Sequence, residues 1–149
     1  MAVLEWRDLL QLAVSLEERG RDFYAGLAGQ APNGEAAEVF RQLAAEEEEH
    51  AVVFRRGLPD GGAGISQEQA SYLEALGRTN LFAVDPDAAG NPRRALGVAI
   101  EAEKESILFY TELASMVQGG QARETLDRLL KAEKLHLVEL RNRLEEDWP

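Results

Sequence analysis

The chain has 149 residues and a formal net charge of −11, with 45% hydrophobic and 29% charged residues. These values are typical of one globular domain, and the acidic balance argues against a nucleic-acid partner because phosphate binding needs a basic face. The chain has no cysteine, which excludes disulfides, thiolate zinc sites, iron–sulfur clusters and thiolate-bound iron.

The first eight residues include Glu5 and Asp8 and lack the apolar segment of a signal peptide. No apolar stretch is long enough to cross a bilayer, so we expect no membrane partner. A cytoplasmic protein with one domain over residues 1–149 is therefore predicted.

A first helical hairpin is predicted from the spacing of apolar residues by three and four. Its first helix should run from about Leu4 to Gly29. Residues 31–34 (APNG) break this helix, and Asn33 is a plausible N-cap for a second helix that runs to about Arg56. The apolar positions that define the two faces are Leu9, Ala13, Leu16, Gly20, Phe23 and Leu27, then Phe40, Leu43, Ala44, Ala51 and Phe54.

A connection of roughly 35 residues follows, and it contains a short helix. Residues 57–64 hold four glycines and a proline and are predicted as a loop, as are residues 85–92. Residues 66–69 (SQEQ) form a capping box that opens the short helix, and Gly77 is predicted to stop it. Its apolar residues, with those just after it, should pack on the bundle or on a second chain; they are Tyr72, Leu73, Leu76, Leu81 and Phe82. We favour a homodimer, which could exchange hairpins between its chains.

A second helical hairpin is predicted after this connection. Asn91 and Pro92 have the N-cap and first-turn chemistry of a helix that should end near Gln118. Gly119 and Gly120 turn the chain into a last helix over about residues 122–146. Two hairpins joined by one long crossover indicate an all-α, ferritin-like four-helix bundle.

The two hairpins are copies of one pattern. The only two histidines occur as Glu47-x-x-His50 and Glu133-x-x-His136, with both residues displaced by 86 positions. The same displacement relates Glu17 to Glu103, Tyr24 to Tyr110 and Leu43 to Leu129. Such a repeat predicts a pseudo-twofold bundle with these residues near its axis.

The repeated acids and histidines fall on the apolar faces of their helices. Glu47 is four residues beyond Leu43, and Glu133 is four residues beyond Leu129. Four buried carboxylates would be very costly without partners, whereas two divalent cations would balance their charge. The nearby acids that compete with Glu17 and Glu103 for these buried positions are Glu18, Glu101 and Glu105. The acids beside Glu47 are expected on a solvated face; they are Glu46, Glu48 and Glu49. Trp6 and Trp148 are expected to pack at the bundle ends or in an interface.

The residue pattern resembles the di-iron carboxylate site of the ferritin-like superfamily, with one Glu on each of two helices and Glu-x-x-His on each of the others. Residues 16–24 (LEERGRDFY) and 102–110 (AEKESILFY) resemble the rubrerythrin family in particular. The resemblance implies that Glu17 and Glu103 are terminal ligands, Glu47 and Glu133 bridge both metals, and His50 and His136 bind one metal each. Tyr24 and Tyr110 are expected to donate hydrogen bonds to ligand carboxylates, a supporting role in catalysis.

The implied function is a di-iron oxidoreductase with two iron ions per bundle, for which manganese or zinc could substitute. Its oxidant would be hydrogen peroxide or dioxygen, which admits both peroxide or oxygen scavenging and ferroxidase activity. The alternatives are a non-catalytic iron, manganese or zinc binding module that handles metal, and a metal-free helical scaffold.

Two features differ from the longer members of the family. The chain has no rubredoxin segment with four cysteines, so an external electron-donor protein is expected. Ser106 stands one turn after Glu103, where longer members carry an extra carboxylate that can exchange with a histidine as ligand.

Overall fold

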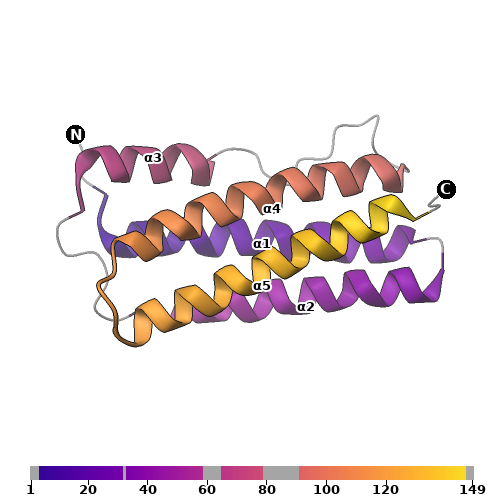
Figure 1. The fold of residues 1–149 in the computed structure, drawn as a ribbon, viewed down its shortest axis with the longest axis horizontal. Coiled ribbons are helices and arrows are strands. Elements are labelled where there is room, and N and C mark those ends of the chain that lie inside the picture. The colour runs from indigo at the N-terminus through magenta and orange to yellow at the C-terminus, as the bar shows by residue number, and fades with distance from the viewer. Residues whose placement is uncertain (1–3, 32, 59–64, 79–90, 147–149) are drawn as a thin grey trace.

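The computed structural model describes residues 4–31, 33–58, 65–78 and 91–146. Four long helices and one short helix occur within these ranges (Figure 1). They are α1 (Trp6–Gln30), α2 (Gly34–Arg56), α3 (Gln67–Arg78), α4 (Pro92–Ser115) and α5 (Gly120–Glu145). The predicted all-α bundle of two hairpins with a helix in the crossover is confirmed.

Local sequence signals set where most of these helices begin. The side chain of Asn33 accepts a hydrogen bond from the amide of Ala36, and Asn91 does the same for Arg94. Ser66 and Gln69 bond reciprocally to each other's backbone amides, which is the predicted capping box. Each contact satisfies an amide that the first turn of a helix leaves without a partner.

Two helix ends differ from the prediction. α4 ends at Ser115, because the guanidinium of Arg123 on α5 binds the carbonyl oxygens of Ala114 and Val117 at 3.0 and 3.4 Å. Gly77 lies inside the last turn of α3 and does not follow it. A Cβ at Gly77 would come within 3.1 Å of Leu12, so the glycine permits α3 to approach α1 closely.

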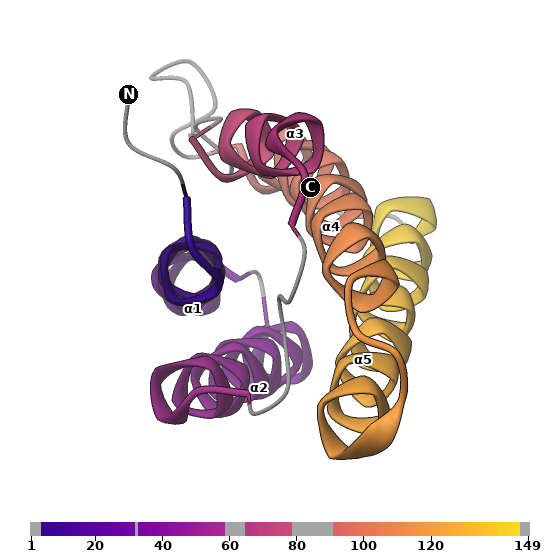
Figure 2. The same cartoon turned by 90° about the vertical axis from the view of Figure 1, so that its left-hand side faces the viewer.

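The two hairpins lie side by side (Figure 2). The crossover makes α2 and α4 run in the same direction, opposite to α1 and α5 (Figure 1). α3 packs on α1 and α4, and Leu73 on its inner face is fully buried, whereas Tyr72 is 44% exposed. The short helix therefore packs on the bundle of its own chain. Leu81 and Phe82 lie outside the described residues, as do residues 59–64 of the loop predicted at 57–64 and residues 85–90 of the loop predicted at 85–92.

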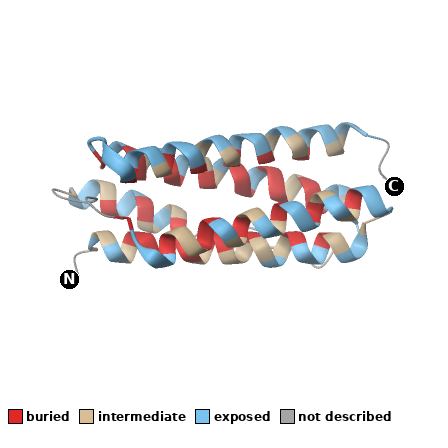
Figure 3. Ribbon diagram, turned by 90° about the horizontal axis from the view of Figure 1, so that it is seen from below, coloured by how far each residue is buried: buried red, intermediate tan, exposed pale blue. Residues whose placement is uncertain are grey.

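Buried residues recur along each long helix on the side that faces the bundle interior (Figure 3). Large aromatic and aliphatic residues fill most of this interior, including Tyr24, Phe40, Phe54, Phe109 and Tyr110. Trp6 is partly buried, and its indole N–H donates to the carbonyl of Leu58 at 3.1 Å, so it ties the start of α1 to the end of α2. Trp148 lies outside the described residues.

None of the helices in the described part of the chain is long and apolar enough to cross a membrane.

Candidate metal centre

Polar residues interrupt the apolar core midway along the bundle. Four glutamates and two histidines are buried there, one or two from each long helix, and all are 8% exposed or less. They are Glu17 on α1, Glu47 and His50 on α2, Glu103 on α4, and Glu133 and His136 on α5. The structure thus brings together all six residues that the repeat singled out. The competing acids Glu18, Glu101 and Glu105 are not buried.

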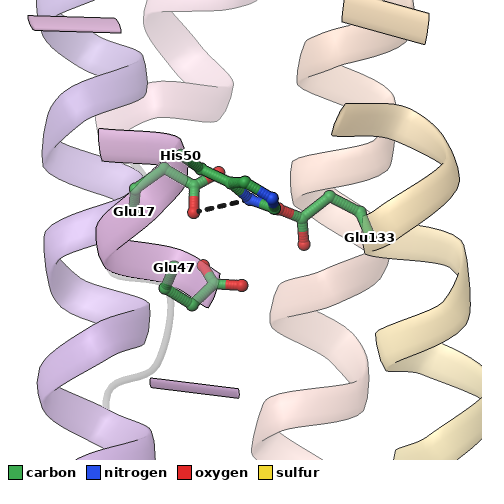
Figure 4. A group of neighbouring side chains, drawn as sticks. All are labelled: Glu17, Glu47, His50 and Glu133. Carbon is green, nitrogen blue, oxygen red and sulfur yellow. Dashed lines mark hydrogen bonds and ion pairs between the residues drawn. The ribbon is translucent and has the colours of Figure 1, made fainter. Parts of the chain in front are cut away.

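The six residues form two groups of four with suitable atoms for a metal ion. Glu17, Glu47, His50 and Glu133 offer ligand atoms that all lie within 4.8 Å of one another, and Figure 4 shows these side chains converging from three helices. The second group contains Glu47, Glu103, Glu133 and His136 within the same limit. Glu47 and Glu133 belong to both groups, so each offers ligand atoms to both.

The two tyrosines connect the hairpins around this cluster. The hydroxyl of Tyr24 on α1 donates to Oε1 of Glu103 on α4 at 2.5 Å. Tyr110 on α4 donates in the same way to Oε1 of Glu17 on α1. Each tyrosine is fully buried and holds the glutamate of the opposite hairpin, as the pseudo-twofold repeat requires.

Several ligand-type atoms in the cluster are buried and make no well-aligned hydrogen bond, although some of them face an opposite charge at 3.0–3.5 Å. They are Oε2 of Glu17, Oε2 of Glu103, Oε2 of Glu133, Oε1 of Glu47 and Nδ1 of His136. Buried polar atoms without partners are rare because desolvation costs about 1–3 kcal/mol each. Since these atoms are an oxygen from each of the four glutamates and a nitrogen from one histidine, the residues present fit a pair of metal ions.

Without a metal ion, the buried carboxylates of this cluster repel one another, and burial and this repulsion shift the pKa values of Glu47 and Glu103. Burial raises the pKa of Glu47 well above its usual value, and repulsion from Glu133 and Glu17 raises it further. Burial and Glu133 likewise raise the pKa of Glu103. For Glu17 burial acts in the same direction, but hydrogen bonds with Glu47 and His50 outweigh it and lower the pKa.

The pKa values of the two histidines are raised by the neighbouring carboxylates, against the effect of burial. Burial lowers the pKa of His50, but hydrogen bonds to Glu133 and Glu17 outweigh it and raise the pKa to about 10. Burial also disfavours the charged form of His136, yet contacts with Glu103, Glu133 and Glu47 raise its pKa strongly. Without metal the histidines therefore act as the cations of the cluster, and a metal ion must displace their protons to bind.

Glu46, which was expected on a solvated face, is only partly exposed and contacts the candidate site. The side chain of Glu46 is 34% exposed, and its Oε2 lies 2.5 Å from Nε2 of His136. Its other oxygen accepts from Gln42 at 3.1 Å. The interpretation holds better for its neighbours, since Glu49 is exposed and Glu48 pairs with Arg21 and Arg55 at the surface.

A groove between α2 and α5 reaches the cluster from outside. Its volume is about 700 Å³, and Glu46 and His136 line it together. Leu135 and Val138 on α5 also line the groove and are 59% and 56% exposed. The edge of His136 that points away from the cluster is therefore the part of the site nearest the surface here.

Comparisons with known proteins agree with this geometry. Residues 8–144 match the sequence profile of the rubrerythrin family. A crystal structure from Thermotoga maritima, described as a ferritin-like diiron-carboxylate protein, is 28% identical, with a TM-score of 0.69 and 98% of each chain covered. No curated protein matches the chain.

Proposed function

The chain belongs to the rubrerythrin family, and from that premise we propose that it is a di-iron oxidoreductase that uses hydrogen peroxide or dioxygen as oxidant. The observation that carries the proposal is the pair of buried four-residue groups that share Glu47 and Glu133. Four carboxylates and two imidazoles suit two divalent ions in both charge and ligand type.

The residues that would hold the two ions follow from their grouping. Glu17 and His50 would bind one ion, Glu103 and His136 would bind the other, and Glu47 and Glu133 would bind both. When bound, two ferrous ions supply the two electrons that reduce one peroxide molecule.

The surrounding residues would orient these ligands and keep the site dry. The hydroxyls of Tyr24 and Tyr110 each engage Oε1 of a terminal glutamate, which leaves Oε2 free for a metal ion. Such outer contacts fix the orientation of ligand side chains and support metal affinity. Ser106 is buried one turn from Glu103 and offers no carboxylate there, so the proposal requires no exchange of ligands at that position.

The groove between α2 and α5 is the route by which we expect small reactants to approach. Of the six clustered residues, only His136 lines this groove, together with Glu46. An external electron-donor protein would have to return the metals to the ferrous state, because the chain has no cysteine with which to hold a second iron centre or a thiol pair.

The test is a stoichiometric oxidation of the ferrous protein. The protein would be loaded anaerobically with two Fe(II) per chain and mixed with limiting peroxide, while ferric absorption is followed. We expect about one peroxide consumed per two iron ions. Turnover should then stop until an electron-transfer protein and reductant are added. Glu47→Ala is the matched variant, because it removes one shared ligand and should abolish both loading and oxidation.

Three results would contradict the proposal. Protein loaded with two ferrous ions that reduces neither peroxide nor dioxygen would leave a metal-binding module without turnover. Manganese or zinc as the main metal of natively purified protein would point to the same class. Retention of tens of ferric ions per chain would move the protein into iron storage.

A further inference from the structure

We propose that Glu46 makes the two metal positions unequal, so that the position formed by Glu103 and His136 binds its ion more tightly than the one formed by Glu17 and His50. Glu46 is a positioning residue: it acts through His136. This inference rests on the proposed two-metal centre and concerns an acid outside both groups of ligands.

The contact between Glu46 and His136 is held in place by neighbours of both residues. Oε2 of Glu46 lies 2.5 Å from Nε2 of His136, and Gln42, one turn earlier on α2, donates to Oε1 of Glu46 at 3.1 Å. The side chain of His136 is only 4% exposed. The carboxylate of Glu46 is therefore fixed against the ring nitrogen that points away from the cluster.

The ring orientation leaves Nδ1 of His136 for the metal. Nδ1 lies 3.0 Å from Oε1 of Glu47 and 3.5 Å from oxygens of Glu103 and Glu133. A carboxylate that accepts the proton on one ring nitrogen fixes the tautomer in which the other nitrogen carries the lone pair. It also raises the basicity of that ligand nitrogen, which strengthens its bond to a metal ion.

The repeat shows that the other position lacks this support. The displacement of 86 positions that relates His50 to His136 places Ala132 at the equivalent of Glu46. Ala132 is half-buried, as Glu46 is, but has no acceptor. Nδ1 of His50 faces Glu133 and Glu17 at 3.1 and 3.5 Å, and nothing in the described ranges accepts from its Nε2. The two groups of ligands are otherwise identical in residue type.

The test is metal binding and proton exchange with Co(II) as the probe. Calorimetric titration of the wild-type chain and Glu46→Ala would give the affinities of both binding steps. We expect the first step to weaken by about 10–100-fold in Glu46→Ala. Glu46→Gln should recover most of this loss, because its amide oxygen can still accept from Nε2. Glu49→Ala is the matched control, since it removes an exposed acid of equal charge from the same helix and should change neither step.

Proton NMR of the Co(II)-loaded chain gives a readout that charge alone would not alter. The wild type should show one slowly exchanging ring N–H proton shifted by the metal, from Nε2 of His136, and this signal should disappear in Glu46→Ala. Ala132→Glu should strengthen the His50 position and add a second slow signal.

The outcomes separate this inference from the proposed function. Glu46→Ala with both affinities and the slow proton unchanged would overturn the inference while leaving the two-metal centre intact. A wild-type chain that binds no Co(II) or Fe(II) would overturn both.

Discussion

The sharing of two glutamates between the metal positions predicts a difference between variants of bridging and terminal ligands. Glu133→Ala removes a ligand from both groups, whereas Glu17→Ala removes a ligand from one. In the metal-free chain Glu133→Ala removes two opposing effects, the repulsion that raises the pKa of Glu47 and Glu103 and the contact with His50 at 3.1 Å, so its net effect there should be small. The cost of the substitution should therefore fall on the loaded state.

The size of the effect follows from linkage between binding and folding. At a free metal concentration one hundred times the dissociation constant, each bound ion stabilises the fold by about 2.7 kcal/mol. Two ions would contribute about 5 kcal/mol, or a rise in melting temperature of about 10–20 °C for a domain of this size. Chelation should remove this rise from the wild type. Glu17→Ala should retain about half of it, and Glu133→Ala almost none.

Differential scanning calorimetry with and without Fe(II) measures the rise in melting temperature, and metal analysis of each variant measures the number of bound ions. A Glu133→Ala chain that keeps two ions and the full rise in melting temperature would refute the assignment of Glu133 as a shared ligand. A wild type whose melting temperature does not respond to complete chelation would refute burial of the cluster around metal.

Three further outcomes are expected. In the metal-free chain the pKa of His50 is raised from 6.5 to about 10. The stability that protonated His50 contributes is therefore complete below pH 6.5 and is lost as the pH rises toward 10. The melting temperature of the metal-free chain should fall over that range, whereas that of the loaded chain should not. Tyr110→Phe removes the donor to Glu17 and should weaken metal binding by about 10–100-fold in a titration, with unchanged helical circular dichroism. Gly119→Ala places a side chain at φ +98° and should lower the free energy of unfolding by about 1–2 kcal/mol in urea melts, with metal content unchanged.

Most of the fold could be predicted because its signals are local. Asn33, Asn91 and the capping box at Ser66 act within one turn of the helix they open, so the sequence around them is sufficient. The end of α4 depends on Arg123 of the next helix, and that contact has no signal in the residues near Ser115. The position of Gly77 is likewise explained by Leu12, which is far away in the sequence.

The six residues of the cluster could be found because they occur twice at one displacement. Glu46 could not be found in this way, since its counterpart is Ala132 and it stands in a run of four acids. Its role depends on the distance between α2 and α5, which no periodicity within one helix reveals. The groove between these helices was unpredictable for the same reason. The homodimer, the electron donor and the cytoplasmic location remain predictions.

The presence of two metal ions between the four helices is tested most directly by anomalous diffraction at the iron edge from crystals of the Fe(II)-loaded chain. Two peaks about 3.5–4 Å apart are predicted, with Glu47 and Glu133 touching both. One peak should lie beside Glu17 and His50 and the other beside Glu103 and His136. A single peak, or iron bound only at the acidic surface while the buried cluster is empty, would contradict the two-metal centre.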